Sequence, residues 1–190
     1  MAEVVLFHHA LGLTPGVRAF ADDLRAAGHT VHTPDLYGGR TFDDLDAGVA
    51  HAMNDLGPSV VVELGESAVA ELPTDLVYVG MSLGAMPAQA LAMTRPGARG
   101  AVLLHSAVPL EHFGDGSWPD DVPLQLHLME GDNADGDVDV ARELADAVPT
   151  ADLFLYPGDA HLFTDRYLPD FDEQAAGSVL RRVLALLDAG

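Results

Sequence analysis

The sequence of 190 residues suits one domain, and its 48% apolar content is enough for a sizeable core. Thirty acidic residues against nine arginines and no lysine give a net charge of −21, which argues against nucleic acids and anionic membranes as partners. The absence of cysteine excludes disulfides and thiolate metal sites, and no apolar run is long enough for a membrane-spanning helix.

Apolar runs alternate with amphipathic stretches along the chain, and they predict strands and helices respectively. In chain order, we expect a strand over residues 3–9, a helix over 14–28, a strand over 29–36, helices over 41–57 and 59–72, a strand over 75–80, a helix over 83–93, strands over 99–106 and 122–130, a helix over 137–148, a strand over 151–158 and a helix over 173–190. The first ten residues lack the pattern of a signal peptide, so we expect a cytoplasmic protein.

Local signals help to define the helices. Gly28 is a natural stop for the first helix. Thr41, with an acidic residue three positions later, predicts a capping box at the start of the second. The segment 59–72 is ambiguous, because Val60 to Val62 favour a strand while its length and glutamate spacing favour a helix. We expect a helix there.

Strands that alternate with helices predict an α/β fold, with a mostly parallel sheet of about six strands and helices on both of its faces. The sequence shows no internal repeat, low-complexity linker or second domain, so we expect a single domain over residues 1–190. The segment 111–121 is a loop rich in Gly, Asp and Pro. Few residues remain for a lid or cap domain.

The clearest motif is the pentapeptide Gly80-Met81-Ser82-Leu83-Gly84, between a predicted strand and a predicted helix. Gly-x-Ser-x-Gly in this context is a nucleophile elbow, in which a strained turn exposes the serine hydroxyl and glycine avoids clashes. The helix N-terminus and nearby backbone N–H groups then stabilise an oxyanion. The pentapeptide alone is a weak signal, and the alternatives are an ordinary strand-to-helix turn or a phosphate-binding turn.

A nucleophilic serine needs a base, and the base needs a group that orients it. In this architecture an acid and then a histidine follow the serine in chain order, each after a later strand. His161 follows the predicted strand 151–158 and is the candidate base, the alternative being a surface histidine. Asp132 follows strand 122–130 and is the candidate acid; Asp135 is its main rival, and Glu130 lies close by.

With these residues placed, the chain resembles the dienelactone hydrolases of the α/β-hydrolase superfamily. The matching stretches are HHALGLTPGVRAFADDLRAAGHTVHTPDLY, GMSLGA and YPGDAHLF, and the likeness runs from about Glu3 to Leu187. It implies a compact, capless α/β hydrolase that cleaves an ester or lactone through a covalent acyl-enzyme, with no metal or organic cofactor. By match to the family motif, the oxyanion N–H groups would come from Leu83 and Ala10.

The chain departs from the best-known members of that family at three places. Those members carry cysteine where this chain has Ser82, and glutamate where it has His9. His9 could bind Ser82 or the substrate, or be a satisfied polar residue at a strand end. An arginine that binds the substrate carboxylate is replaced by Asp165, with Arg166 beside it. Arg40 is another loop arginine that could reach the site. Dienelactone itself is therefore not the expected substrate.

The leading hypothesis is a Ser82–His161–Asp132 hydrolase of small esters, lactones or thioesters, as a monomer or homodimer. A second hypothesis is a catalytically silent relative that binds a small ligand in the same pocket. A flavodoxin-like or nucleotide-binding domain is disfavoured, because no Gly-x-Gly-x-x-Gly or phosphate loop follows the first strand. The acidic excess is a solvated surface of biased composition or an adaptation to high salt.

Overall fold

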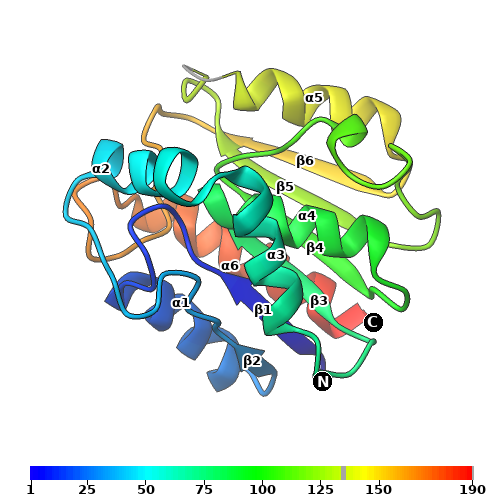
Figure 1. Cartoon of the computed structure of the whole chain (residues 1–190). Helices are drawn as coiled ribbons and strands as arrows, with labels where there is room; N and C mark the ends of the chain where they lie inside the picture. The colour runs from blue at the N-terminus through cyan, green and yellow to red at the C-terminus, as the bar shows by residue number, and fades with distance from the viewer. Residues whose placement is uncertain (134–135, 190) are drawn as a thin grey trace.

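A parallel sheet forms the centre of the molecule (Figure 1). In the part of the chain that this computed structural model describes, residues 1–133 and 136–189, six strands pair in the order β2-β1-β3-β4-β5-β6. They are β1 (Glu3–Phe7), β2 (Thr30–His32), β3 (Val77–Met81), β4 (Gly100–Leu104), β5 (Leu124–Met129) and β6 (Ala151–Tyr156). Every pairing is parallel, so the carboxyl ends of the strands lie at one edge. The predicted α/β class and sheet are confirmed.

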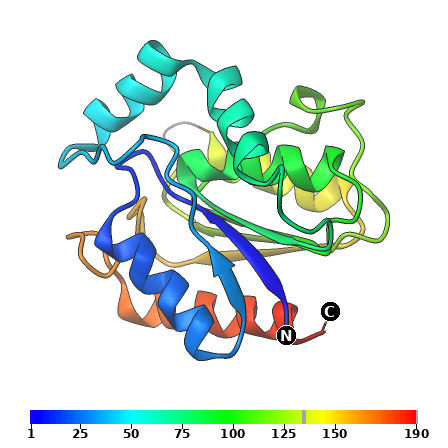
Figure 2. The ribbon, with the colours of Figure 1, turned by 60° about the horizontal axis from the view of Figure 1, so that its bottom comes forward.

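Helices cover both faces of the sheet, as Figure 2 shows. The α-helices of the described residues are α1 (Pro15–Ala26), α2 (Leu45–Ala50), α3 (Pro58–Ala68), α4 (Ala85–Thr94), α5 (Asp137–Ala147) and α6 (Glu173–Ala189). One core joins the sheet to α1 and α6 and includes Phe20 and Val179. The other joins it to α3, α4 and α5 and includes Val61 and Leu91. Both faces of the inner strands β1, β3, β4 and β5 are therefore buried, which explains their continuous apolar runs.

The start of the second helix differs from the prediction. α2 begins at Leu45, and Asp44 is its N-cap, because the Asp44 carboxylate accepts a hydrogen bond from the N–H of Ala47 at 2.9 Å. Thr41 lies in the preceding loop, so the capping box predicted there is wrong. The acid three residues after Thr41 takes the cap position itself, which a short carboxylate does at least as well as threonine.

The other helix signals agree with the structure. Gly28 directly follows the last turn of α1 with a φ of 98°, a left-handed conformation that glycine adopts at little cost. The ambiguous segment 59–72 is helical through most of its length, as α3. Before α3, a π-helical segment over His51–Leu56 extends α2. None of the described helices has the length and apolar character needed to cross a membrane.

A buried polar network ties β5 and β6 to α6. The Tyr156 hydroxyl donates to Nδ1 of the fully buried His127 at 2.9 Å, and Nε2 of His127 donates to Oε1 of Gln125 at 3.1 Å. The same hydroxyl accepts a hydrogen bond from Arg182 of α6 at 2.8 Å. Burial, and then the charge of Arg182, lowers the pKa of His127 to about 3. Burial likewise lowers the pKa of His8, which follows β1, to about 4.

We expect the free energy of unfolding to fall as the pH is lowered from 6.5 to 5. The folded-state pKa of His8 and of His127 lies below the unfolded value of about 6.5, so the unfolded chain binds protons that the folded chain does not. Each group then removes about 2 kcal/mol of stability at pH 5. Urea unfolding of wild type and His127→Gln tests this. The variant should depend less steeply on pH, and equal slopes would contradict the assignment.

Candidate active site

Ser82 lies on a tight turn between β3 and α4. A 3-10 turn over Ser82–Gly84 links the strand to the helix, and Ser82 has a φ of 50°, in the left-handed region. A Cβ on Gly80 would lie 2.2 Å from the carbonyl oxygen of Gly84, and one on Gly84 would lie 2.4 Å from that of Phe7. Both positions therefore require glycine, as a nucleophile elbow does. The turn sets the Ser82 hydroxyl at the carboxyl edge of the sheet.

Gly84→Ala should lower the free energy of unfolding by about 3 kcal/mol or more, because the backbone of β1 blocks the added methyl group. Gly177→Ala is the matched control, since its Cβ would meet only Arg181, at 3.6 Å, and alanine favours the helix. Urea unfolding of both variants measures the difference. A loss below about 1 kcal/mol for Gly84→Ala would contradict the close packing of the elbow.

Three polar side chains from different strand ends form one hydrogen-bonded chain. Oγ of Ser82 lies 2.8 Å from Nε2 of His161, which follows β6. Nδ1 of the same ring lies 2.7 Å from Oδ2 of Asp132, which follows β5. An ionised carboxylate only accepts, so Nδ1–H donates to Asp132 and Nε2 is left to accept the Ser82 proton. The geometry is that of a serine, its base and the group that orients the base.

The loops after β5 and β6 meet where Asp132 reaches His161. The N–H of Gly131 donates to the carbonyl of Gly158 at 2.8 Å, and a Cβ on Gly131 would lie 2.8 Å from the same oxygen. Glycine at this position therefore lets the two loops approach, and Asp132 is the next residue. Of the other acids considered, Glu130 is exposed, and Asp135 lies outside the described residues.

His9 is hydrogen-bonded to Asp165 and not to Ser82. Nε2 of His9 lies 3.0 Å from Oδ2 of Asp165, and each side chain is 1% exposed. The Thr14 hydroxyl donates to the same oxygen at 2.9 Å, and the N–H of Leu11 donates to Nδ1 of His9 at 3.3 Å. Burial opposes ionisation of Asp165, but the hydrogen bonds that its carboxyl group receives from His9, the N–H of Tyr167 and Thr14 outweigh it and lower the pKa of Asp165. His9 therefore fits the satisfied polar residue at a strand end, and it is not hydrogen-bonded to Ser82. Its contact with a substrate stays a prediction.

Arg40 lies in an aromatic cluster on the loop after β2. Its guanidinium is 4.6 Å from the ring centroid of Phe42, and its Nη1 is 3.5 Å from Nδ1 of His51. Neither contact involves a residue of the hydrogen-bonded chain around Ser82. The role of Arg40 in substrate binding stays a prediction.

The two backbone N–H groups predicted to form an oxyanion site lie at neighbouring strand ends. Leu83 follows Ser82 in the first turn of a helix, where N–H groups lack an intrahelical acceptor. Ala10 lies in the turn after β1, the strand that pairs with β3, and no hydrogen bond found among the described residues uses its N–H. The role of both N–H groups in binding an oxyanion stays a prediction.

Two polar residues near the hydrogen-bonded series Ser82–His161–Asp132 were missed by the sequence analysis. Asp137, at the start of α5, accepts a hydrogen bond from Oγ of Ser106 at 2.6 Å. Burial raises the pKa of Asp137. His105, after β4, has its ring centroid 6.0 Å from that of His161. His105 directly follows a strand, as Ser82 does. That position could have marked His105 as a candidate site residue.

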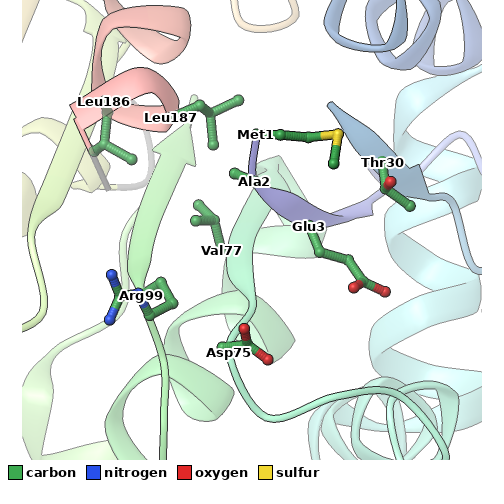
Figure 3. Close-up of a pocket in the computed structure, with 9 residues that line it drawn as sticks. All are labelled: Met1, Ala2, Glu3, Thr30, Asp75, Val77, Arg99, Leu186 and Leu187. Atoms are coloured by element: carbon green, nitrogen blue, oxygen red, sulfur yellow. The ribbon is translucent and has the colours of Figure 1, made fainter. Parts of the chain in front are cut away.

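The pocket in Figure 3 lies at the opposite edge of the sheet from Ser82. It has a volume of about 410 Å³ and is lined by residues such as Glu3 of β1 and Val77 of β3, with Asp75 and Arg99 beside them. These residues lie at the amino ends of the strands, so the pocket is separate from the candidate active site. Among the described residues, no group of three or more His, Asp or Glu side chains could hold a metal ion.

Several known proteins are similar to this chain over nearly its whole length. The dienelactone hydrolase family matches residues 1–189. A protein from Klebsiella pneumoniae assigned as a dienelactone hydrolase shares 18% identity and a TM-score of 0.74, over 99% of this chain and 87% of that one. A dienelactone hydrolase-like promiscuous phosphotriesterase from metagenomic libraries shares 16% identity and a TM-score of 0.73, over 100% and 86%. The esterase Est2 of Thermogutta terrifontis shares 18% identity and a TM-score of 0.60, over 99% and 82%.

At these identities the solved structures show a shared fold, the α/β-hydrolase fold, and nothing more specific. No curated protein matches the sequence. The family match is independent of the solved structures and extends over nearly the whole chain. The resemblance found in the sequence is thereby confirmed: the chain belongs to the dienelactone hydrolase family.

Proposed function

We propose that the protein is a serine hydrolase that cleaves small esters, lactones or thioesters through a covalent acyl-enzyme. The observation that carries this proposal is the unbroken chain of two hydrogen bonds, 2.8 Å from Ser82 to His161 and 2.7 Å from His161 to Asp132. Nucleophile, base and orienting acid are within the distances that proton transfer requires. Membership of a family of ester-hydrolysing enzymes supports the same reaction class.

Acylation follows from this geometry. His161 takes the proton of the Ser82 hydroxyl on Nε2 as Oγ attacks the carbonyl carbon, and Asp132 stabilises the imidazolium that forms. The N–H groups of Leu83 and Ala10 are the candidate donors to the tetrahedral oxyanion. Collapse of the intermediate breaks the bond to the leaving oxygen or sulfur. That atom takes the proton from Nε2 and departs as an alcohol or thiol, or stays attached as the hydroxyl of an opened lactone.

Deacylation repeats the sequence with water. His161 removes a proton from a water molecule, whose oxygen attacks the acyl carbon, and the second tetrahedral intermediate then releases the carboxylic acid. The proton on Nε2 returns to Oγ of Ser82, which restores the resting enzyme. Asp132 stays ionised throughout and keeps the imidazole in the tautomer that faces Ser82.

Partitioning of the acyl-enzyme tests this mechanism. Two esters of one acid with different leaving groups should give the same ratio of methyl ester to free acid in aqueous methanol, because both pass through one acyl-enzyme. A ratio that changes with the leaving group would contradict a common covalent intermediate. A folded protein that turns over no ester, lactone or thioester would instead favour the ligand-binding alternative.

A further inference from the structure

We propose that His105 is a positioning residue that holds His161 in line with Ser82. It acts through Thr164, three residues after His161, and so controls the loop that carries the base. This inference rests on the proposed function, because it assigns a role in the action of the same hydrogen-bonded chain. His105 itself does not contact the reacting atoms.

His105 lies directly after β4, between the strands that carry Ser82 and Asp132. Its Nε2 is 2.8 Å from Oγ1 of Thr164. Its ring packs edge-on against Phe163, with centroids 4.7 Å apart. One side chain at the end of β4 therefore contacts two consecutive residues of the His161 loop.

The same loop is fixed from its other side by the contact between His9 and Asp165. Both Thr164 and Asp165 are buried, at 4% and 1% exposure. A Cβ on Gly16 would overlap the Asp165 carboxyl group, so glycine at the start of α1 makes room for that anchor. The loop thus has one anchor toward β1 and α1 and another toward β4. In the second anchor, the ring of His105 lies 6.0 Å from that of His161, centroid to centroid.

The backbone of His105 is strained. Its φ is 73°, and among the described residues Ser82 is the one other non-glycine residue with a positive φ. Such a conformation persists only where the surroundings impose it, and it clusters at functional sites. Here the N–H of His105 donates to the carbonyl of His127 at 2.8 Å, which holds the strained residue against β5.

Burial of a histidine side chain at position 105 is also energetically unfavourable. His105 is 1% exposed, and its Nδ1 has no hydrogen-bond partner among the described residues. Burial, then the nearby rings of His161, His9 and His127, keep the pKa of His105 well below its usual value, so the ring is neutral. Because a buried N–H without an acceptor is rare, we assign the proton to Nε2, which donates to Thr164. An apolar side chain would avoid the unpaired nitrogen, and glycine would avoid the strain. Stability therefore does not explain a histidine at this position.

Loss of the contact with Thr164 would free the loop that carries His161. The distance of 2.8 Å between Nε2 of His161 and Oγ of Ser82 would then be held less firmly, although the bond to Asp132 remains. A displacement of about 1 Å in a catalytic group costs about 100-fold in rate. The reaction step should suffer more than substrate binding, because the contact of His105 with Thr164 acts on the loop that carries the proposed base.

Substitutions of His105 separate this role from stability. His105→Asn accepts the positive φ, but its shorter amide ends near the position of Nδ1 and does not reach Thr164. His105→Gln places an amide nitrogen near the position of Nε2, although its backbone tolerates a positive φ poorly. We therefore expect the Asn variant to be folded and slow, and the Gln variant to be less stable and faster than the Asn variant.

The readouts are the rate at which a fluorophosphonate labels Ser82, and kcat and KM for a small ester. His105→Asn and Thr164→Val should each lower the labelling rate and kcat by about 10- to 100-fold, with KM within about twofold of wild type. The double variant should be no slower than His105→Asn alone, because both changes remove one contact. His105→Gln should recover most of the rate.

His29→Asn is the matched control. His29 is also buried, its Nδ1 accepts a hydrogen bond from the N–H of Ala2 at 3.2 Å, and its Nε2 lacks a hydrogen-bond partner among the described residues, with the Asp188 carboxylate 3.7 Å away. It lies before β2, at the amino edge of the sheet. This variant should label at the wild-type rate even if it is less stable.

Three results separate failure of this inference from failure of the proposed function. Wild-type protein that fails to label overturns the proposed function and this inference with it. Labelled wild type with an equally fast His105→Asn variant overturns the inference alone. An equal loss of rate in His29→Asn also overturns it, because the effect would then follow general destabilisation. The expected result is slow labelling confined to His105→Asn and Thr164→Val.

Discussion

Ser82→Ala will lower kcat for ester hydrolysis by about 10⁴- to 10⁶-fold and leave the fold intact. The reason is that Oγ of Ser82, 2.8 Å from Nε2 of His161, is the proposed nucleophile, and the methyl group of alanine can form no acyl-enzyme. The residual rate would come from the oxyanion donors and from substrate binding alone. Steady-state kinetics with a small activated ester measure the loss, and circular dichroism verifies the fold.

Ser178→Ala is the control for this prediction. Ser178 lies in α6, where its hydroxyl donates to the carbonyl of Gln174 at 2.9 Å and is exposed to solvent. Its kcat should equal that of wild type. A Ser82→Ala variant that kept more than about 1% of the wild-type kcat would contradict nucleophilic catalysis by this serine.

Asp132→Asn will lower kcat by about 10⁴-fold. In the proposed mechanism Oδ2 of Asp132, 2.7 Å from Nδ1 of His161, fixes the tautomer in which Nε2 accepts the serine proton. An asparagine amide can donate to Nδ1, which moves the imidazole proton to Nε2 and leaves the ring unable to act as a base. The substitution changes one atom of the side chain, so it tests the tautomer and not the packing.

Asp135→Asn is the comparison that decides which aspartate is the acid. If Asp132 orients His161, kcat for Asp135→Asn should stay within about tenfold of the wild-type value, because removal of the orienting acid costs about 10⁴-fold. Both variants are measured with the same ester across pH 5 to 8, so that a shifted pH optimum is not read as a loss. A larger loss for Asp135→Asn than for Asp132→Asn would assign the acid to Asp135.

Most of the sheet and the elbow could be predicted because local sequence determines them. Continuous apolar runs such as that of β4 occur where both faces of a strand are buried, and their alternation with helices leaves few alternatives to a parallel sheet. Gly80 and Gly84 stand where any Cβ would overlap a backbone carbonyl. The helix start was less certain, because Thr41 and Asp44 compete as caps and differ little in strength.

The contacts that hold the His161 loop could not be predicted. His9 and Asp165 are separated by 156 positions, and His105 and Thr164 by 59, so no local pattern links either pair. The sequence shows which strand each residue follows, but not the path of the loop beyond it. The family resemblance marked His9 and Asp165 separately, as two residues that differ from those of the best-known members. The structure shows that these two residues form one buried pair.

The most direct test of the catalytic account is the intact mass of wild type and Ser82→Ala after treatment with a fluorophosphonate. The account predicts one covalent adduct on wild type and none on Ser82→Ala, because only a serine activated by His161 reacts rapidly with this reagent. Folded wild-type protein without an adduct would contradict an activated Ser82. An adduct of equal yield on Ser82→Ala would show that another residue is the nucleophile.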